Sequence, residues 1–250
     1  MIACEVMTRE VSALAAQSDN IISVRWLRQG LHDTPALLGT MLRDKIREVE
    51  EQNEALPAER RYDAILLGYG LCSNGVIGVG SDTLPVVIPK CDDCIALFLG
   101  SERRYLELFR AHKGIYWYTP GWIDMAFTPS PESYRRQFEE YAALYGEDNA
   151  RYLVEEGNSW IKNYNFACYI KSPVYHRDAY SRYCQTAAES FGWEYREEPG
   201  SMDYFSALLN GDWDEERFLV CPPGYQLEAT YDERKLMAVP ANQCEQAADA

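Results

Sequence analysis

The stretch Tyr62–Ser101 constrains the fold more than any other part of this sequence, because it holds two strand-like runs that each lead into a cysteine-bearing loop. The first run, Ala64–Leu67, is wholly apolar and is followed by the glycine-rich segment GYGLCSNG at 68–75. That pattern is typical of a buried parallel strand ending in a tight turn. The second run, residues 84–88, leads through a proline to CDDC at 91–94, where an apolar helix is expected to begin. Because open α/β sheets bind ligands at the carboxyl ends of their strands, we predict the site at these loops.

The rest of the chain alternates between strand-like and helix-like segments. Strands are predicted at 1–4, 21–27, 115–118, 166–170, 193–195 and 218–221, and helices at 8–16, 35–49, 105–114, 129–157, 178–191 and 202–209. The alternation predicts an α/β protein with two Rossmann-like lobes, mainly parallel sheets and an interlobe cleft. We expect an N-terminal lobe at 1–125, a C-terminal lobe at 126–240 and a flexible tail at 241–250.

Composition and charge narrow the possible partners. The chain of 250 residues is 47% hydrophobic and 25% charged, which is ordinary for globular proteins. A formal net charge of −15 with no visible basic face argues against a nucleic-acid partner. No run approaches the roughly 18 consecutive apolar residues of a membrane span, and the start shows no basic-then-apolar leader, so we expect a cytoplasmic protein without a membrane partner. In that compartment the eight cysteines are expected to be reduced, which favours metal or thiolate chemistry over disulfides.

Cys91 and Cys94 are the strongest candidates for chemistry. Their C-x-x-C spacing allows two sulfurs to bind one metal ion or to form a redox pair. A helix that begins at Ile95 would lower the pKa of a neighbouring thiol. The two aspartates between the cysteines disfavour a thioredoxin-like thiolate, but the same carboxylates could help to hold a cation.

Further candidate ligands extend this set. Cys72 ends the neighbouring strand, Cys4 lies near the end of the first strand, and Cys221 would supply a sulfur from the second lobe across the cleft. His32, on a loop expected at the same sheet edge, could ligate a metal or act as an acid or base. The alternatives are buried structural thiols, the commonest fate of free cysteine, and a surface turn histidine. Three further cysteines are interpreted as packing or tail residues: Cys168, Cys184 and Cys244.

The glycine-rich turn and an aromatic segment are candidates for cofactor binding. Gly68, Tyr69, Gly70 and Asn74 belong to a strand-to-helix turn whose backbone N–H groups could cradle an anion. The turn matches neither the phosphate-binding nor the dinucleotide-binding glycine motif, and a tight turn that needs positive φ is the alternative. Trp122 completes an aromatic group that could form a wall for a flat or methylated ligand through cation–π contact. The other members of that group are Tyr116, Trp117 and Tyr118, and core packing is the alternative for all of them.

Several strings together resemble the domain of unknown function 1638 family. They are the opening ACEV, GLHDTP, LLGYGLCSNG, IPKCDDCIALFLGS, IYWYTPGW and FLVCPPG, and the resemblance covers about Met1–Tyr225. Members of the family are found in bacteria and archaea, often in genomic company with corrinoid-dependent methyltransferases. The positions of Cys72, Asp93 and Cys94 resemble the family pattern, whereas a polar or basic residue often stands where this chain has Cys91 or Asp92.

The residues and the resemblance lead to one functional prediction and one alternative. The prediction is a cysteine-ligated metal ion or iron–sulfur cluster, or a corrinoid-related ligand, in an accessory protein or enzyme of one-carbon (methyl transfer) metabolism. The partner would be a small molecule or a corrinoid protein. The role in one-carbon metabolism and the link to corrinoids are implied by the resemblance alone. The alternative is a metal-free binding module for a small methylated compound, built on the aromatic wall. No hydrolase motif is present, so a hydrolase is disfavoured.

Overall fold

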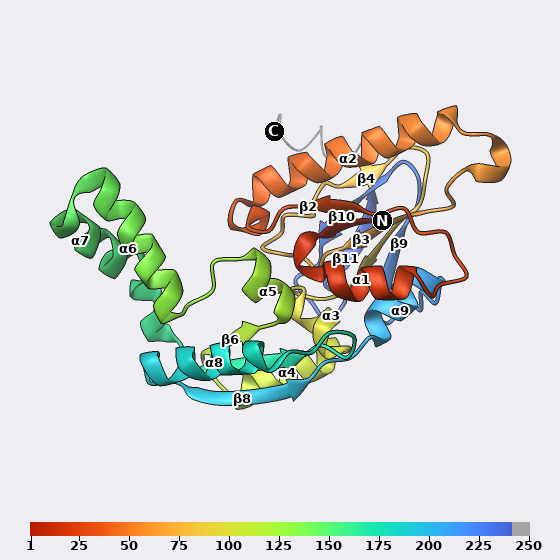
Figure 1. The fold of residues 1–250 in the computed structure, drawn as a ribbon. Coiled ribbons are helices and arrows are strands. Elements are labelled where there is room, and N and C mark those ends of the chain that lie inside the picture. The colour runs from red at the N-terminus through yellow and green to blue at the C-terminus, as the bar shows by residue number, and fades with distance from the viewer. Residues whose placement is uncertain (242–250) are drawn as a thin grey trace. The chain divides into compact units, whose positions relative to one another are not determined.

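The chain forms two compact units in the computed structural model, which describes residues 1–241 (Figure 1). One unit consists of Met1–Glu102 together with the chain from Ser201 onward, and the other is Arg103–Gly200. Cys244 and nearly all of the predicted tail lie outside the described residues. No helix in the described part of the chain has both the length and the apolar character needed to cross a membrane.

The first unit is built on a five-stranded sheet with the order β2-β1-β3-β5-β9. Its strands are β1 (Ile2–Cys4), β2 (Arg25–Leu27), β3 (Ile65–Gly68), β5 (Val86–Pro89) and β9 (Phe218–Cys221). All neighbouring pairs are parallel except β5 and β9, which run antiparallel. Both β3 and β5 are buried along their whole length, as the apolar runs predicted.

Helices cover both faces of this sheet (Figure 1). On one face, α2 (Pro35–Ala55) places Leu38, Leu42 and Ile46 at four-residue spacing against the apolar side chains of the sheet. The other helices of the unit are α1 (Thr8–Ala15), α3 (Ile95–Leu99) and α9 (Asp203–Asn210). Both α1 and α3 pack against α9, and the rings of Phe98 and Phe205 meet edge to face at 5.4 Å.

A second, antiparallel sheet in this unit has the order β11-β10-β4 and was not predicted from the sequence. Its strands are β4 (Gly80–Ser81), β10 (Tyr225–Ala229) and β11 (Leu236–Pro240). The two-residue β4 is too short for a periodic signal. Leu227 and Leu236 are buried in the same apolar cluster as the α2 face, so the late hairpin is part of the first unit's core.

The second unit has a parallel sheet with the order β6-β7-β8. Its strands are β6 (Ile115–Tyr118), β7 (Phe166–Lys171) and β8 (Glu194–Pro199). Its helices are α5 (Pro120–Met125), α6 (Pro131–Tyr145), α7 (Glu147–Gly157) and α8 (Asp178–Phe191), and α4 (Glu102–Ala111) begins at the last residue of the first segment. Tyr118 and Tyr169 are fully buried in its core.

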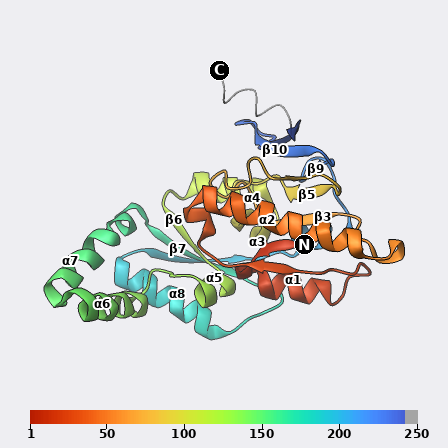
Figure 2. The same cartoon turned by 90° about the horizontal axis from the view of Figure 1, so that it is seen from above.

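The helical segment predicted at 129–157 is two helices that lie side by side (Figure 1, Figure 2). The break falls at Gly146, whose φ of 79° lies in the left-handed region that glycine adopts without strain. Aromatic side chains recur along these two helices as a stripe, which is exposed at Tyr145 and Tyr152, while Tyr134 packs edge to face on Phe191. A pair of helices has too little partner surface to bury a whole stripe.

The α/β class is confirmed, and the predicted division of the chain is corrected. The second unit ends at Gly200, and β9, β10 and β11 return to the first unit, where β9 hydrogen-bonds to β5 and β10 hydrogen-bonds to β4. A lobe at 126–240 would separate these strands from their partners. The strand predicted at 21–27 is also shorter, because β2 pairs with β1 only at Arg25–Leu27 and Ile21 is exposed. The Rossmann-like lobes and the interlobe cleft stay predictions.

Candidate functional site

Three neighbouring strands of the first unit end in cysteine-bearing segments at one edge of the sheet. Cys4 ends β1, Tyr69 and Cys72 follow β3, and Cys91 and Cys94 follow β5. These strands are adjacent and parallel, so their carboxyl ends share that edge. The strand order reverses between β1 and β3, which is where open α/β sheets bind ligands. We call these five residues the cysteine edge.

The loops after β3 and β5 are joined by backbone hydrogen bonds. Leu71 donates its N–H to the Cys91 carbonyl at 2.9 Å, and Cys72 donates to the Asp92 carbonyl at 3.0 Å. Gly70 permits this approach, because a Cβ there would lie 2.7 Å from the Cys91 oxygen and 2.9 Å from its sulfur. Gly68 is similarly close to β1, where an added Cβ would lie 2.6 Å from that of Ala3. Packing therefore explains both glycines that were predicted to bind a cofactor.

Cys72, Ser73 and Asn74 adopt three consecutive left-handed conformations, with φ of 45°, 57° and 64°. The turn is closed by a hydrogen bond from the Gly75 N–H to the Cys72 carbonyl at 3.1 Å. Asparagine tolerates this region better than most residues, whereas cysteine and serine enter it at a cost in free energy. The positive φ predicted for this turn is thus found at three residues other than glycine.

Burial favours the protonated form of three thiols of the cysteine edge. It raises the pKa of Cys4 to about 11 and that of Cys72 to about 12, and it raises the pKa of Cys91 well above its ordinary value. The expectation that a helix N-terminus lowers a thiol pKa here is therefore wrong for Cys91. Reactive cysteines need a depressed pKa, so burial works against a nucleophilic role for these three thiols.

The Tyr69 hydroxyl has no hydrogen-bond partner among the residues described, although only 4% of this residue is exposed. Burial raises its pKa, and Cys4, Cys72 and Cys94 are near enough to raise it further. A buried hydroxyl without a partner costs about 1–3 kcal/mol, so such a group needs an explanation. Its position among three thiols makes it the clearest sign of a ligand in this unit.

A lysine and two carboxylates adjoin the cysteine edge, and sequence reasoning did not identify the lysine or Glu102. Lys235, in the β10–β11 loop, places its ammonium 2.6 Å from Asp92 and 3.3 Å from Glu102. Burial, together with the Asp92 charge, raises the pKa of Glu102 to about 7 against the opposing effect of Lys235. Lys235 lies 143 positions from Asp92, so no local pattern could have paired them.

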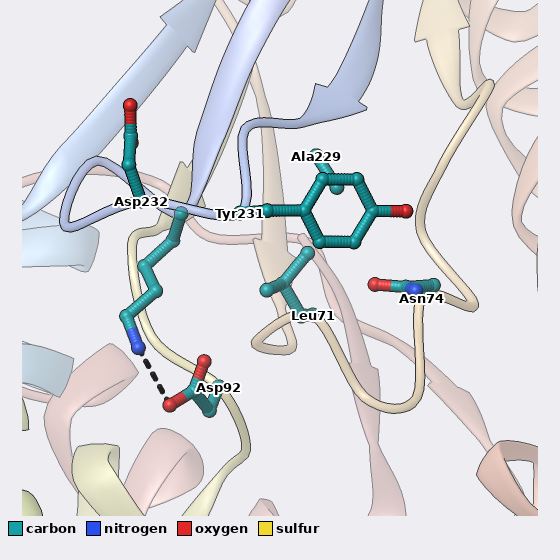
Figure 3. A pocket seen from close by; sticks show the side chains of 7 residues that line it. Leu71, Asn74, Asp92, Ala229, Tyr231 and Asp232 are labelled. Carbon is teal, nitrogen blue, oxygen red and sulfur yellow. Dashed lines mark hydrogen bonds and ion pairs between the residues drawn. The ribbon is translucent and has the colours of Figure 1, made fainter.

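A pocket of about 250 Å³ opens beside these residues (Figure 3). Leu71, Asn74 and Asp92 line it from the loops after β3 and β5, and Tyr231 and Lys235 line it from the β10–β11 loop. The Tyr231 ring extends across the pocket above Leu71 and towards Asn74 (Figure 3). Asn74, one of the predicted cofactor-binding residues, thus lines this pocket.

Cys221 is not at the cysteine edge, which corrects its predicted place across an interlobe cleft. It belongs to β9 of the first unit and pairs with Val86, the first residue of β5. Cys91 follows the other end of β5, and a four-residue strand spans roughly 10 Å. Because β9 is antiparallel, its carboxyl end lies at the opposite edge of the sheet.

The other candidates have separate surroundings. His32, which follows β2 at the carboxyl edge, lies 3.3 Å from the Asp33 carboxylate and is partly exposed. Trp122 is in α5 of the second unit, with its backbone N–H bonded to the Thr119 hydroxyl at 3.1 Å. Tyr118, a member of the predicted aromatic wall, is fully buried and donates to the Pro129 carbonyl at 2.8 Å. Two cysteines are buried in the second unit, as predicted for packing residues: Cys168 and Cys184.

The cysteine edge fits a soft metal by its chemistry but not by its present side-chain positions. Within residues 1–241, no three His, Cys, Asp or Glu side chains are arranged to hold a metal ion. Thiols are nevertheless the donors that zinc, copper(I) and iron–sulfur clusters prefer, and the Tyr69 hydroxyl beside them has no hydrogen-bond partner among the residues described. Binding would require the thiols to rotate towards one another.

The chain has the architecture of the α/β proteins with an open, mainly parallel sheet, a class whose members differ widely in function. Within it, the chain belongs to the family described as protein of unknown function (DUF1638), whose model matches residues 26–209. That match spans β3, β5 and their loops, and it confirms the resemblance drawn from the sequence. No curated protein and no solved structure matches the chain.

Proposed function

We propose that the cysteine edge holds a thiolate-ligated metal ion or iron–sulfur cluster. The observation that carries the proposal is the buried, unpartnered Tyr69 hydroxyl among thiols from three adjacent strands. Cys72, Cys91 and Cys94 are the proposed ligands, with Cys4 as the fourth donor. His32 stays an outlying candidate, and the proposal leaves out Cys221, which lies at the opposite edge of the sheet.

Metal binding would reverse the protonation of these thiols. The ligands must lose their protons, so affinity should rise with pH and binding should release protons. Tyr69 could then donate its hydroxyl hydrogen to a thiolate sulfur, which would satisfy the hydroxyl and orient the ligand. When bound, a centre of this kind supplies Lewis acidity or one-electron transfer.

The proposed physiological setting is one-carbon metabolism, in an accessory protein or enzyme. This part of the proposal rests on the family resemblance, which brings with it a corrinoid or a corrinoid protein as the partner. The sheet edge supports it only in general terms, because parallel strand ends are where such folds bind cofactors. The experiment below therefore distinguishes a corrinoid-related ligand at the same edge from a metal ion or iron–sulfur cluster.

The test is metal analysis of protein purified without oxygen. We expect iron with sulfide, or zinc, at near-stoichiometric amount, and cobalt with a corrinoid spectrum would identify the corrinoid form. Cys94→Ser should lose most of this content, whereas the matched control Cys221→Ser should keep it, since that thiol is buried at the opposite edge. Cys94 is only partly buried, so the serine variant should fold, which circular dichroism would check.

Two outcomes would contradict the proposal. Parent protein that is colourless and free of metal after anaerobic preparation and reconstitution would leave the alternative, a metal-free module for a small methylated compound. Equal metal content in Cys94→Ser and Cys221→Ser would show that the ligands lie elsewhere.

A further inference from the structure

The pocket beside the cysteine edge is bounded by two backbone-strained loops. Among the residues described, the non-glycine positions with left-handed φ are Cys72, Ser73, Asn74, Tyr231 and Lys235. All five belong to the loop after β3 or to the β10–β11 loop, and these two loops line the same pocket. The strained positions of the described chain thus gather around one cavity.

Such strain persists only where the surroundings hold it. Each left-handed non-glycine residue costs on the order of 1–3 kcal/mol, and residues of this kind cluster at binding sites. In the late loop, Thr230 donates to the Lys235 carbonyl and Lys235 donates to the Asp232 carbonyl, both at 3.1 Å. The ion pairs of Lys235 fasten that loop to the first unit's core. These contacts hold Tyr231 at the pocket with φ of 55°.

The charges around the pocket favour a cation. The Lys235 ammonium is shared between Asp92 and Glu102, so this lysine brings no excess positive charge to the pocket. Arg234 forms an ion pair with Asp232 at 2.7 Å, so these two residues together add no net charge. Arg234 is thus already paired, and an incoming anion would meet the Asp92 carboxylate on the loop after β5.

Tyr231 supplies an aromatic face at the same place. This residue is 88% exposed, although its ring lines the pocket beside the apolar side chain of Leu71 (Figure 3). An aromatic ring held in water by a strained backbone gains little from packing. Ring faces attract ammonium groups, with about 0.5–1 kcal/mol at exposed sites and more after desolvation.

We propose that this pocket binds a small alkylated ammonium compound, with the cationic group between the Tyr231 ring and the Asp92 carboxylate. The volume of about 250 Å³ is below the range of roughly 300–1,000 Å³ typical of drug-sized ligands, so the compound must be small. Leu71 and Ala229 provide the apolar contact for its alkyl groups. The inference does not depend on a metal at the cysteine edge.

The experiment measures binding of choline to the full chain by ligand-observed NMR and calorimetry, using metal-free protein. The neutral isostere of choline, in which carbon replaces the ammonium nitrogen, and inorganic phosphate are the comparison probes. We expect saturable choline binding, at least tenfold weaker binding of the isostere, and no binding of phosphate. Tyr231→Leu should weaken choline binding about fivefold, Tyr231→Phe should preserve it, and Asp92→Asn should weaken it by a similar factor.

The control variant is Tyr152→Leu, which removes an exposed tyrosine from α7 of the second unit and should leave choline binding unchanged. Melting temperatures would show that each variant is folded. Equal affinity for choline and its isostere would overturn the charge assignment, and phosphate binding without choline binding would overturn the ligand class. Loss of choline binding in Tyr231→Phe, or its retention in Tyr231→Leu, would overturn the role of the ring. None of these outcomes depends on metal content.

Discussion

Glu102 shows at the residue scale how the fold changes ordinary chemistry. Its side chain is 15% exposed and shares Lys235 with Asp92. Burial and the Asp92 charge outweigh the lysine and raise the carboxyl pKa from 4.5 to about 7. The folded protein therefore holds this proton up to neutral pH, whereas the unfolded chain releases it about two pH units lower.

We predict that the free energy of unfolding depends less on pH in Glu102→Gln than in the parent protein. Below pH 4.5 the carboxyl group is protonated in both states and its contribution to folding is fully present. Between pH 4.5 and 7 the unfolded chain loses the proton first, so stability falls by up to about 3 kcal/mol as pH rises. Urea unfolding from pH 4 to 8 should show this decline in the parent and a smaller one in the variant. Parallel curves would contradict the raised pKa.

At the scale of elements, Glu50 connects α2 to the loop that follows β4. One carboxylate oxygen accepts hydrogen bonds from the Ser81 hydroxyl at 2.6 Å, the Asp82 N–H at 2.8 Å and the Thr83 N–H at 2.9 Å. Partial burial raises the pKa of this carboxyl group, but the hydrogen bonds together hold it below its ordinary value. The helix therefore fixes the loop that leads into β5 and the cysteine edge.

We predict that Glu50→Ala lowers the free energy of unfolding by about 1–3 kcal/mol, because hydrogen bonds to a charged group are lost together. The parent should also lose this contribution as pH falls below about 4.5, since the depressed pKa stabilises the folded state only while the group is ionised. Glu48→Ala is the control on the same helix, as that side chain pairs only with Lys45 at the surface among contacts described. Equal losses in the two variants would contradict the role given to Glu50.

At the scale of the whole molecule, the chain leaves its first unit after Glu102 and re-enters it at Ser201. The inserted unit has its own parallel sheet and its own buried core around Tyr118 and Tyr169. The first unit is completed only by the late strands, because β9 pairs with β5 and β10 pairs with β4.

We predict that the fragment 103–200 folds by itself and that the fragment 126–240 does not. The first keeps β6, β7 and β8 together, whereas the second lacks β6 and carries β9 without β5 and the β10–β11 pair without β4. Near-ultraviolet circular dichroism and thermal unfolding of the two fragments would check this. A cooperative transition in 126–240, or its absence in 103–200, would contradict the division into units.

The sequence by itself determined the α/β class, the family, and the central strands with their cysteine loops. Those features are local, since apolar runs such as Ile65–Gly68 and glycines such as Gly70 carry their own signal. Only the tertiary structure decided that β9 is antiparallel to β5, which moves Cys221 to the far edge, and that Lys235 meets Asp92. Strand direction and ion pairing depend on partners more than a hundred positions away, and side-chain periodicity carries no information about them.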